Sequence, residues 1–166
     1  MNAGQRAQRL HFARERSNWP VALWGRVLFS DEKIFRVASN RNGEYVTRTL
    51  EEKFHPDCIQ GVTKGGPQVH VWGAIGWRGV SELIHIQGNL NANEYQQQVL
   101  SRIQAIGANI AGFGGLGGQQ AWTFQQDNAP PHRAHTSQQY LQARNVPVLE
   151  WPANSPDLSP IENVWA

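Results

Sequence analysis

The segment from Trp122 to His132, with the sequence WTFQQDNAPPH, sets the strictest limits on the fold of this chain. It opens with three aromatic or β-branched residues, which favour a β-strand. After Asp127, the prolines Pro130 and Pro131 prevent the strand from continuing, because proline has no amide hydrogen to donate. The pattern therefore predicts a carboxylate at the carboxyl end of a strand. Ligands bind at that edge of open α/β sheets.

The length of 166 residues is sufficient for one domain with a sizeable core. No apolar run is long enough for a transmembrane span, so we expect no membrane partner. The stretch from Met1 to Arg16 is polar and carries arginines, which does not fit a secretory signal. Cys58 is the only cysteine, which excludes an internal disulfide and is typical of a reducing, intracellular compartment.

Basic residues are concentrated near the N-terminus, although the net charge is only +2. Between Arg6 and Arg48 the chain has nine Arg or Lys residues against four Asp or Glu. This excess indicates an anionic partner such as a phosphate backbone. The alternative is an ordinary solvated surface.

A second carboxylate, Asp31, lies within a strand predicted over Val27–Val37. The first residues of this strand are apolar on both faces, which is typical of a buried strand. A carboxylate there is costly unless it is paired or bound to a cation. Two interpretations remain open for Asp31: a salt bridge to Lys33 or an arginine, or a cation site.

The rest of the chain alternates between helical and strand patterns. We expect helices over 4–16, after a cap at Asn18, and over 91–106, 132–144 and 160–166. Further strands are expected over 44–49, 69–77, 80–87, 122–124 and 146–152. This order describes an α/β fold with a mixed sheet. Gly73 and Gly76 inside one strand indicate a bulge or the close approach of another backbone.

Three connecting segments show weaker signals. A turn is expected over 40–43, followed later by a long loop over 50–67. Within that loop, His55-x-x-Cys58 would be half of a metal site, but no second half is visible. The glycine-rich segment 107–118 lacks the Gly-Lys-Ser/Thr of a phosphate loop, so a flexible connector is expected.

A third carboxylate, Glu162, stands near the start of the last predicted helix. Ser159 has the properties of an N-cap, and Pro160 fits the first helical position. Glu162 then occupies the third position of a capping box, a role that requires no catalysis. The alternative is that Glu162 joins the two aspartates.

The predicted topology brings the strands that carry Asp31 and Asp127 side by side, with Glu162 after the last strand. Three carboxylates would then converge at one edge of the sheet. Like charges repel, so each carboxylate should raise the pKa of the others unless cations bind. Two Mg²⁺ or Mn²⁺ ions suit such oxygen ligands and in-line phosphoryl transfer.

Four motifs resemble the catalytic domain of mariner-type (Tc/mariner) transposases, members of the DDE transposase and integrase group. They are Ser30-Asp31-Glu32, Trp72-Gly73, QDNAPxH over 126–132 and WPxxSPDLxPIENxW over 151–165. Thirty-four residues separate Asp127 from Glu162. This spacing is similar to that of the branch whose third acid is Glu.

The resemblance implies an RNase H-like fold, with a mixed five-stranded sheet flanked by helices. It implies that residues 27–166 form the catalytic domain and that 1–26 form a helical lead-in. By resemblance, Asp31 bridges two metal ions, Asp127 and Glu162 complete the metal sites, and Asn128 and His132 line the pocket. Asp157 is the nearest rival for the third acid, but its Ser-Pro-Asp setting favours a structural role.

The reaction of this family is hydrolysis of a phosphodiester at the transposon end, followed by transfer of the freed strand into target DNA. The implied partners are double-stranded DNA, as transposon ends and target, and a second copy of the chain. The implied location is the nucleus in a eukaryote and the cytoplasm otherwise.

Two departures from the family pattern qualify this expectation. The helix-turn-helix modules that precede the domain in the family are not in this sequence, so we expect weak DNA binding through phosphates. The chain also stops four residues after Glu162, within the C-terminal helix, so that helix has barely one turn. The alternative function is therefore a catalytically inactive, transposase-derived module for DNA binding or assembly. A nuclease acting on RNA–DNA hybrids is less consistent with the long motif over 151–165.

Overall fold

The computed structural model describes residues 1–36, 49–55, 68–111 and 122–166. Its helices are α1 (Ala3–Arg16), α2 (Val21–Trp24), α3 (Ala92–Gln98), α4 (Ile103–Ile110), α5 (Pro130–Arg133), α6 (His135–Ala143) and α7 (Glu162–Trp165). Its strands are β1 (Val27–Arg36), β2 (Gln68–Gly76), β3 (Gly79–Val80), β4 (Ile84–His85) and β5 (Thr123–Gln125). The 3₁₀ turns η1 (Glu51–Phe54), η3 (Leu100–Arg102) and η4 (Pro156–Leu158) complete the list.

The chain divides into two compact units, of which the larger contains every site residue predicted above. This unit comprises Met1–Lys33 and His70–Ala166, and the smaller comprises Ile34–Val69. The larger unit is the one described from here on. None of the helices in the described ranges has the length and apolar character needed to cross a membrane.

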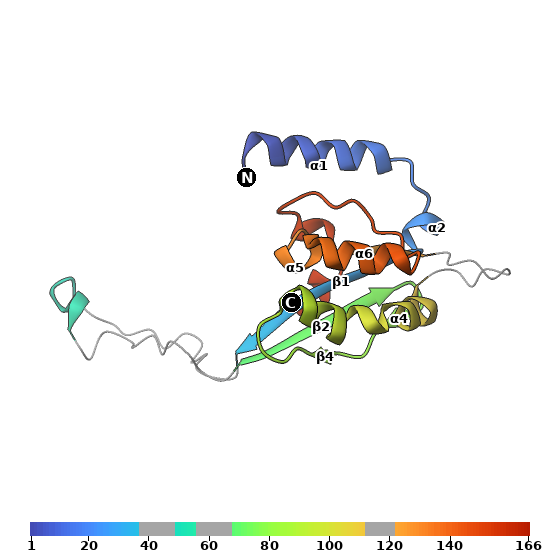
Figure 1. The fold of residues 1–166 in the computed structure, drawn as a ribbon. Coiled ribbons are helices and arrows are strands. Elements are labelled where there is room, and N and C mark those ends of the chain that lie inside the picture. The colour runs from blue at the N-terminus through green and yellow to red at the C-terminus, as the bar shows by residue number, and fades with distance from the viewer. Residues whose placement is uncertain (37–48, 56–67, 112–121) are drawn as a thin grey trace. The chain divides into compact units, whose positions relative to one another are not determined.

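The sheet is mixed and has five strands, as predicted. Its order is β3-β2-β1-β5, and β4 also pairs with β2; Figure 1 shows β1 and β2 side by side. β1 and β5 are parallel, with Val27 opposite Thr123 and Phe29 opposite Gln125, whereas β2 is antiparallel to β3 and β4. The strand that leads to Asp127 therefore neighbours the strand that carries Asp31, which confirms the predicted adjacency.

The two faces of β1 are covered by different apolar clusters, because successive side chains of a strand point in opposite directions. Leu28 belongs to a cluster with Trp72 of β2, Tyr95 of α3 and residues of α4 and α6. Val27 and Phe29 belong to a second cluster, with Phe12 of α1 and Trp151. The prediction of a strand buried on both faces is therefore confirmed. Beyond Phe29, the same alternation sends Asp31 toward the second cluster and Glu32 toward the first.

Several predicted elements differ from those observed. The helix expected over 91–106 is capped by Asn91 as predicted, but it is interrupted by η3 before α4 begins. The second short helix begins after Pro20 and receives no side-chain cap from Asn18. Of the strand expected over 146–152, the structure retains an isolated parallel bridge between Val148 and Phe124. Pro147 explains this difference, since proline cannot donate a hydrogen bond within a ladder.

The close approach predicted at the strand glycines is present. The carbonyl oxygen of Ile110 accepts a hydrogen bond from the backbone N–H of Arg78 at 2.9 Å, and a methyl group at Gly76 would overlap that oxygen. The turn over 40–43, most of the strand over 44–49 and most of the glycine-rich connector lie outside the described residues. The same is true of Cys58 in the proposed half-site with His55.

Candidate active site

Asp31 and Asp127 are brought together by the parallel pairing of β1 and β5. Extending the register of Phe29 with Gln125 by two residues places Asp31 level with Asp127. A buried polar contact reinforces this pairing: the Ser30 hydroxyl donates to the Gln125 carbonyl oxygen at 2.8 Å. The side-chain oxygen of Gln125 in turn accepts from the Ser30 amide at 3.2 Å. These bonds fix the register that the two aspartates require.

Asp31 is a partly buried carboxylate held by an aromatic donor rather than by a cation. The indole N–H of Trp165 donates to Asp31 Oδ2 at 3.1 Å. Burial, followed by the negative charges of Glu32 and Glu162, raises the pKa of Asp31 to about 6, against an opposing effect of the Glu32 amide and the Trp165 indole. No Lys or Arg in the described ranges forms an ion pair with Asp31, so the predicted salt bridge to Lys33 or an arginine is not observed there.

The pKa of Asp127 is shifted in the opposite direction from that of Asp31. Its Oδ1 accepts from the backbone N–H of Ala129 at 2.8 Å, which closes a tight turn, and lies 2.7 Å from His132 Nδ1. The hydrogen bond from His132 lowers the pKa of Asp127, and burial only partly opposes it. The expectation that each carboxylate raises the pKa of the others is therefore wrong for Asp127, because a cationic histidine lies closer than the other two acids.

His132 is buried between two carboxylates. Its Nδ1 contacts Asp127, its Nε2 lies 3.3 Å from Glu32 Oε1, and its ring packs against Tyr95 with centroids 4.4 Å apart. Burial alone would lower the pKa of His132, but the hydrogen bond with Asp127 and the negative charges of Asp127 and Glu32 outweigh it and raise this pKa to about 9. The imidazole is therefore a cation at neutral pH, enclosed by opposite charges on both sides.

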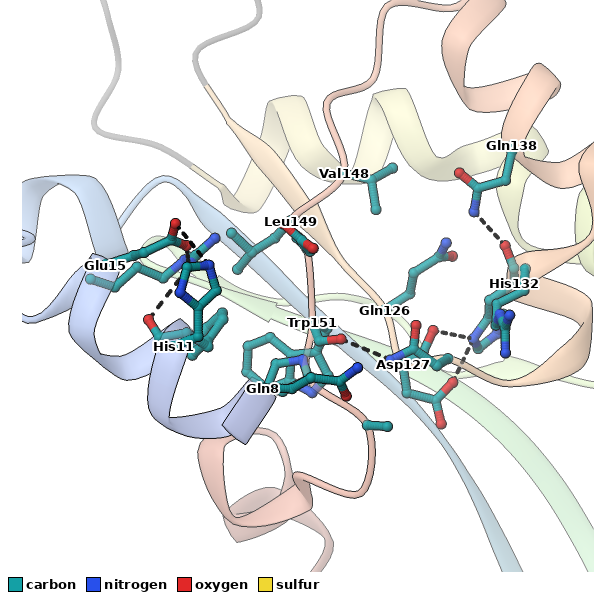
Figure 2. A pocket seen from close by; sticks show the side chains of 17 residues that line it. Gln8, His11, Glu15, Gln126, Asp127, His132, Gln138, Val148, Leu149 and Trp151 are labelled. Carbon is teal, nitrogen blue, oxygen red and sulfur yellow. Dashed lines mark hydrogen bonds and ion pairs between the residues drawn. The ribbon is translucent and has the colours of Figure 1, made fainter. Parts of the chain in front are cut away.

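The neighbouring amides fix the loop that carries Asp127. Asn128 donates from Nδ2 to the Trp151 carbonyl oxygen at 2.8 Å, which joins this loop to the segment before η4. The buried hydroxyl of Tyr95 donates to the side-chain oxygen of Gln126 at 2.7 Å. Gln138 donates to the His132 carbonyl oxygen at 2.6 Å, as drawn in Figure 2. Asn128 and His132 are thus structural parts of the Asp127 turn.

Glu162 is the first residue of α7, a helix of one turn whose preceding residue, Ile161, is only 1% exposed. The helix begins later than predicted. The hydroxyl of Ser159 caps no amide and makes no hydrogen bond to another described residue, whereas the Ser159 carbonyl accepts from the Glu162 amide at 3.3 Å. The capping-box interpretation of Glu162 is therefore wrong, since the helix lacks the cap on which it depends.

Asp157, the rival third acid, is engaged elsewhere. The guanidinium of Arg9 in α1 donates to both of its carboxylate oxygens, at 2.7 and 2.6 Å. This bidentate contact lowers the pKa of Asp157. It also ties α1 to η4, which is the structural role expected for the Ser-Pro-Asp motif.

Asp31, Asp127 and Glu162 line one hollow with a volume of about 480 Å³. The same hollow is lined by Asn128 and Arg133. A second hollow of about 440 Å³ lies between α1 and the Asp127 turn, and Figure 2 looks into it. Within the described ranges, no three His, Cys, Asp or Glu side chains are close enough to form a ready metal cage. The three carboxylates therefore share a hollow without meeting at one point.

Two residues that contact the predicted site residues were not singled out from the sequence: Glu32, which faces His132, and Trp165, which donates to Asp31. A signal for Glu32 was available, because adjacent residues of a strand face opposite sides of the sheet, so Glu32 requires a different partner from Asp31. For Trp165 we find no comparable signal, because its contact with Asp31 spans 134 positions of the chain.

The raised pKa of Asp31 predicts a pH-dependent effect of Asp31→Asn in metal-free protein. A carboxyl with a folded-state pKa of about 6, against an ordinary value of 3.8, lowers stability as the pH rises between these values. Asp31→Asn should therefore leave the free energy of unfolding unchanged near pH 4 and increase it near pH 7. After allowance for solvent screening, the gain is on the order of 1 kcal/mol. Urea unfolding in the presence of a chelator measures it; an equal effect at both pH values would contradict the assignment.

A mixed sheet with carboxylates on a central strand, after its parallel neighbour and on a following helix is the arrangement predicted for an RNase H-like fold. The chain belongs to the DDE superfamily endonuclease family, whose profile matches residues 26–166. This confirms the resemblance based on the four motifs.

Comparisons with individual proteins agree. The Tc3 transposase of Caenorhabditis elegans is 30% identical over 165 residues, which cover 99% of this chain and 46% of the relative. A crystal structure of the mariner Mos1 paired end complex with Mg has a TM-score of 0.67 at 22% identity, covering all of this chain and 50% of that one. A structure of the Mos1 catalytic domain and raltegravir with Mg has a TM-score of 0.56 at 20% identity, covering 97% and 68%. The predicted RNase H-like fold is thereby confirmed. The chain spans about half the length of the curated relatives it matches.

Proposed function

We propose that this chain is the catalytic domain of a DNA transposase. In this proposal, it hydrolyses a phosphodiester bond at a transposon end and transfers the freed strand into target DNA. The observation that carries the proposal is the shared hollow, which receives one carboxylate each from β1, the turn after β5 and α7. We assign the catalytic and cation-binding roles to Asp31, Asp127 and Glu162.

The donor set fits hard divalent cations. All three side chains offer carboxylate oxygens, the ligands that Mg²⁺ and Mn²⁺ prefer. The negative charge of Glu162 already contributes to the raised pKa of Asp31, and a cation in the hollow would relieve that repulsion. We propose two ions, as the chemistry of in-line displacement favours. When bound, they would acidify the attacking water or hydroxyl and stabilise the leaving 3′ oxygen.

The surrounding residues orient these acids and the substrate. Protonated His132 holds Oδ1 of Asp127, which leaves Oδ2 for a cation. Arg133 lines the same hollow and is placed to pair with a phosphate of the DNA backbone. Asn128 keeps the Asp127 turn against the chain at Trp151, so the acid keeps its direction as the substrate enters.

The proposed partner is double-stranded DNA, both as transposon end and as target. Related solved structures are described as Mos1 transposase complexes with a transposon end and as a strand transfer complex. The basic excess between Arg6 and Arg48 suits binding through phosphates. A homodimer, and a nuclear location in a eukaryotic host or a cytoplasmic one otherwise, belong to the same proposal.

One observation favours the second candidate, a catalytically inactive module derived from a transposase. The three carboxylates do not form a ready metal cage in the described ranges. Such a module would bind DNA through its basic residues without cleaving it. The two candidates differ in metal-dependent cleavage.

The deciding experiment compares Glu162→Gln with Asp157→Asn in a plasmid-nicking assay with Mg²⁺ or Mn²⁺. Glu162→Gln should abolish nicking, because Glu162 lines the hollow with the two aspartates. Asp157→Asn should retain most of it, because Asp157 pairs with Arg9 outside that hollow. Wild-type protein that is folded, binds DNA and never nicks it would establish the inactive module instead. Equal loss in both variants would refute the assignment of the third acid.

A further inference from the structure

Trp165, the last residue of α7, forms a long-range hydrogen bond to one of the three proposed acids. Its indole N–H reaches Asp31 Oδ2 at 3.1 Å, across 134 positions of sequence. The contact occupies Oδ2 of the carboxylate. A hydrogen bond from a neighbouring group commonly sets the direction of a metal-binding carboxylate.

The indole is held from its other end by a glycine. A Cβ built on Gly73 of β2 would lie 3.0 Å from Cη2 of Trp165 and 3.2 Å from Cδ2 of Leu83. The tip of the indole therefore rests directly on the backbone of β2. A methyl group at position 73 would be in tight contact with both side chains, so the indole or Leu83 would have to shift by a few tenths of an ångström.

The contacts of Trp165 with Asp31 and Gly73 also fix the position of α7. Glu162 and Trp165 are the first and last residues of this single turn. Side chains three residues apart lie on one face of a helix. Docking of the indole on Gly73 thus fixes the orientation of α7, and with it the placement of Glu162 relative to Asp31. A helix of one turn needs such tertiary support, because it is not stable by itself.

We propose that Trp165 is a positioning residue that orients Asp31, and through α7 also Glu162, for cation binding. The inference rests on the proposed function, because it concerns the acids to which cation binding is assigned. Trp165 touches neither substrate nor cation; it acts through the carboxylate that it holds. Gly73 of the Trp72-Gly73 motif and Trp165 of the IENxW motif lie far apart in the sequence but are in direct contact in the fold.

The test uses Trp165→Phe, which keeps an aromatic ring at this position of α7 but removes the N–H donor. Mg²⁺ binding, measured by calorimetry in the absence of DNA, should weaken about tenfold. The melting temperature should change little. The matched control is Trp77→Phe, a substitution of an indole that is 55% exposed in the β2–β3 hairpin, and it should bind Mg²⁺ like the wild type.

A metal-free measurement separates this inference from the proposed function. In ¹⁵N-labelled protein, Asp31→Asn should shift the indole N–H resonance of Trp165 and leave that of Trp77 in place. Unchanged Mg²⁺ affinity in Trp165→Phe would overturn the positioning role. If wild-type protein binds no Mg²⁺ and cleaves no DNA, the proposed function fails. The indole resonance then decides alone: a shift supports the contact and its absence overturns it. The same resonance decides if Trp165→Phe does not fold.

Discussion

Replacing Asp127 with Asn is expected to reduce metal-dependent cleavage of DNA by about a thousandfold or more while the fold is retained. The carboxylate would supply a cation with a full negative charge, and loss of several kcal/mol of charge stabilisation corresponds to a rate loss of this size. Asparagine keeps an oxygen at Oδ1, so the turn bond from Ala129 and the contact with His132 can both persist. Plasmid nicking, together with circular dichroism, measures both effects.

Asp157→Asn is the matched control for Asp127→Asn, because it removes one carboxylate outside the hollow. An Asp127→Asn variant that nicks at the wild-type rate would show that Asp127 is not a catalytic acid. Without metal, Asp127→Asn should be slightly less stable than the wild type. The lowered pKa of Asp127 shows that its negative charge is favourable in the folded protein.

His132→Ala is expected to produce the largest loss of stability among single substitutions in the site, about 3 kcal/mol near pH 6. The substitution leaves Glu32, whose side chain is 15% exposed, without the cation that faces it. It also removes the donor that holds Asp127 Oδ1 at 2.7 Å. Activity should fall as well, because the Asp127 carboxylate is then free to rotate.

The effect of His132→Ala should depend on pH. A histidine whose pKa rises from 6.5 to about 9 on folding stabilises the protein fully below the unfolded value, and this stability is lost as the pH rises through the folded value. The difference between wild type and variant should therefore be largest near pH 6 and should shrink by about pH 9.5. Urea unfolding at both pH values measures it. His135→Ala, at an exposed position close by, is the control. A constant difference would mean that the loss reflects packing rather than charge.

The Glu32 interaction shows where local patterns stop being informative. Strand periodicity places Asp31 and Glu32 on opposite faces of β1, and this could be stated from the sequence alone. The residue that meets Glu32 could not be stated, because only the tertiary fold brings the histidine of the QDNAPxH motif to the SDE motif. The mistaken expectation about the pKa of Asp127 has the same origin: three acids were considered without the histidine that pairs with one of them.

The last helix shows that a strong local pattern can still predict the wrong helix start. The residues from Ser159 to Glu162 satisfy every local rule for a capped helix start, yet α7 begins at Glu162 and the Ser159 hydroxyl caps nothing. Local propensity is a weak influence over one turn, and burial of Ile161 together with the indole contact of Trp165 outweighs it.

The sequence by itself determined the α/β class and the strands that carry Asp31 and precede Asp127, and its motifs supplied the three acids that we propose as catalytic. These features follow from side-chain periodicity, proline and short motifs, which are local properties of the chain. Only the tertiary structure decided that His132 bridges Asp127 and Glu32, that Arg9 occupies Asp157, and that Trp165 holds Asp31. Each of these pairings joins different elements of the fold. They depend on how helices pack against the sheet, which no local pattern specifies.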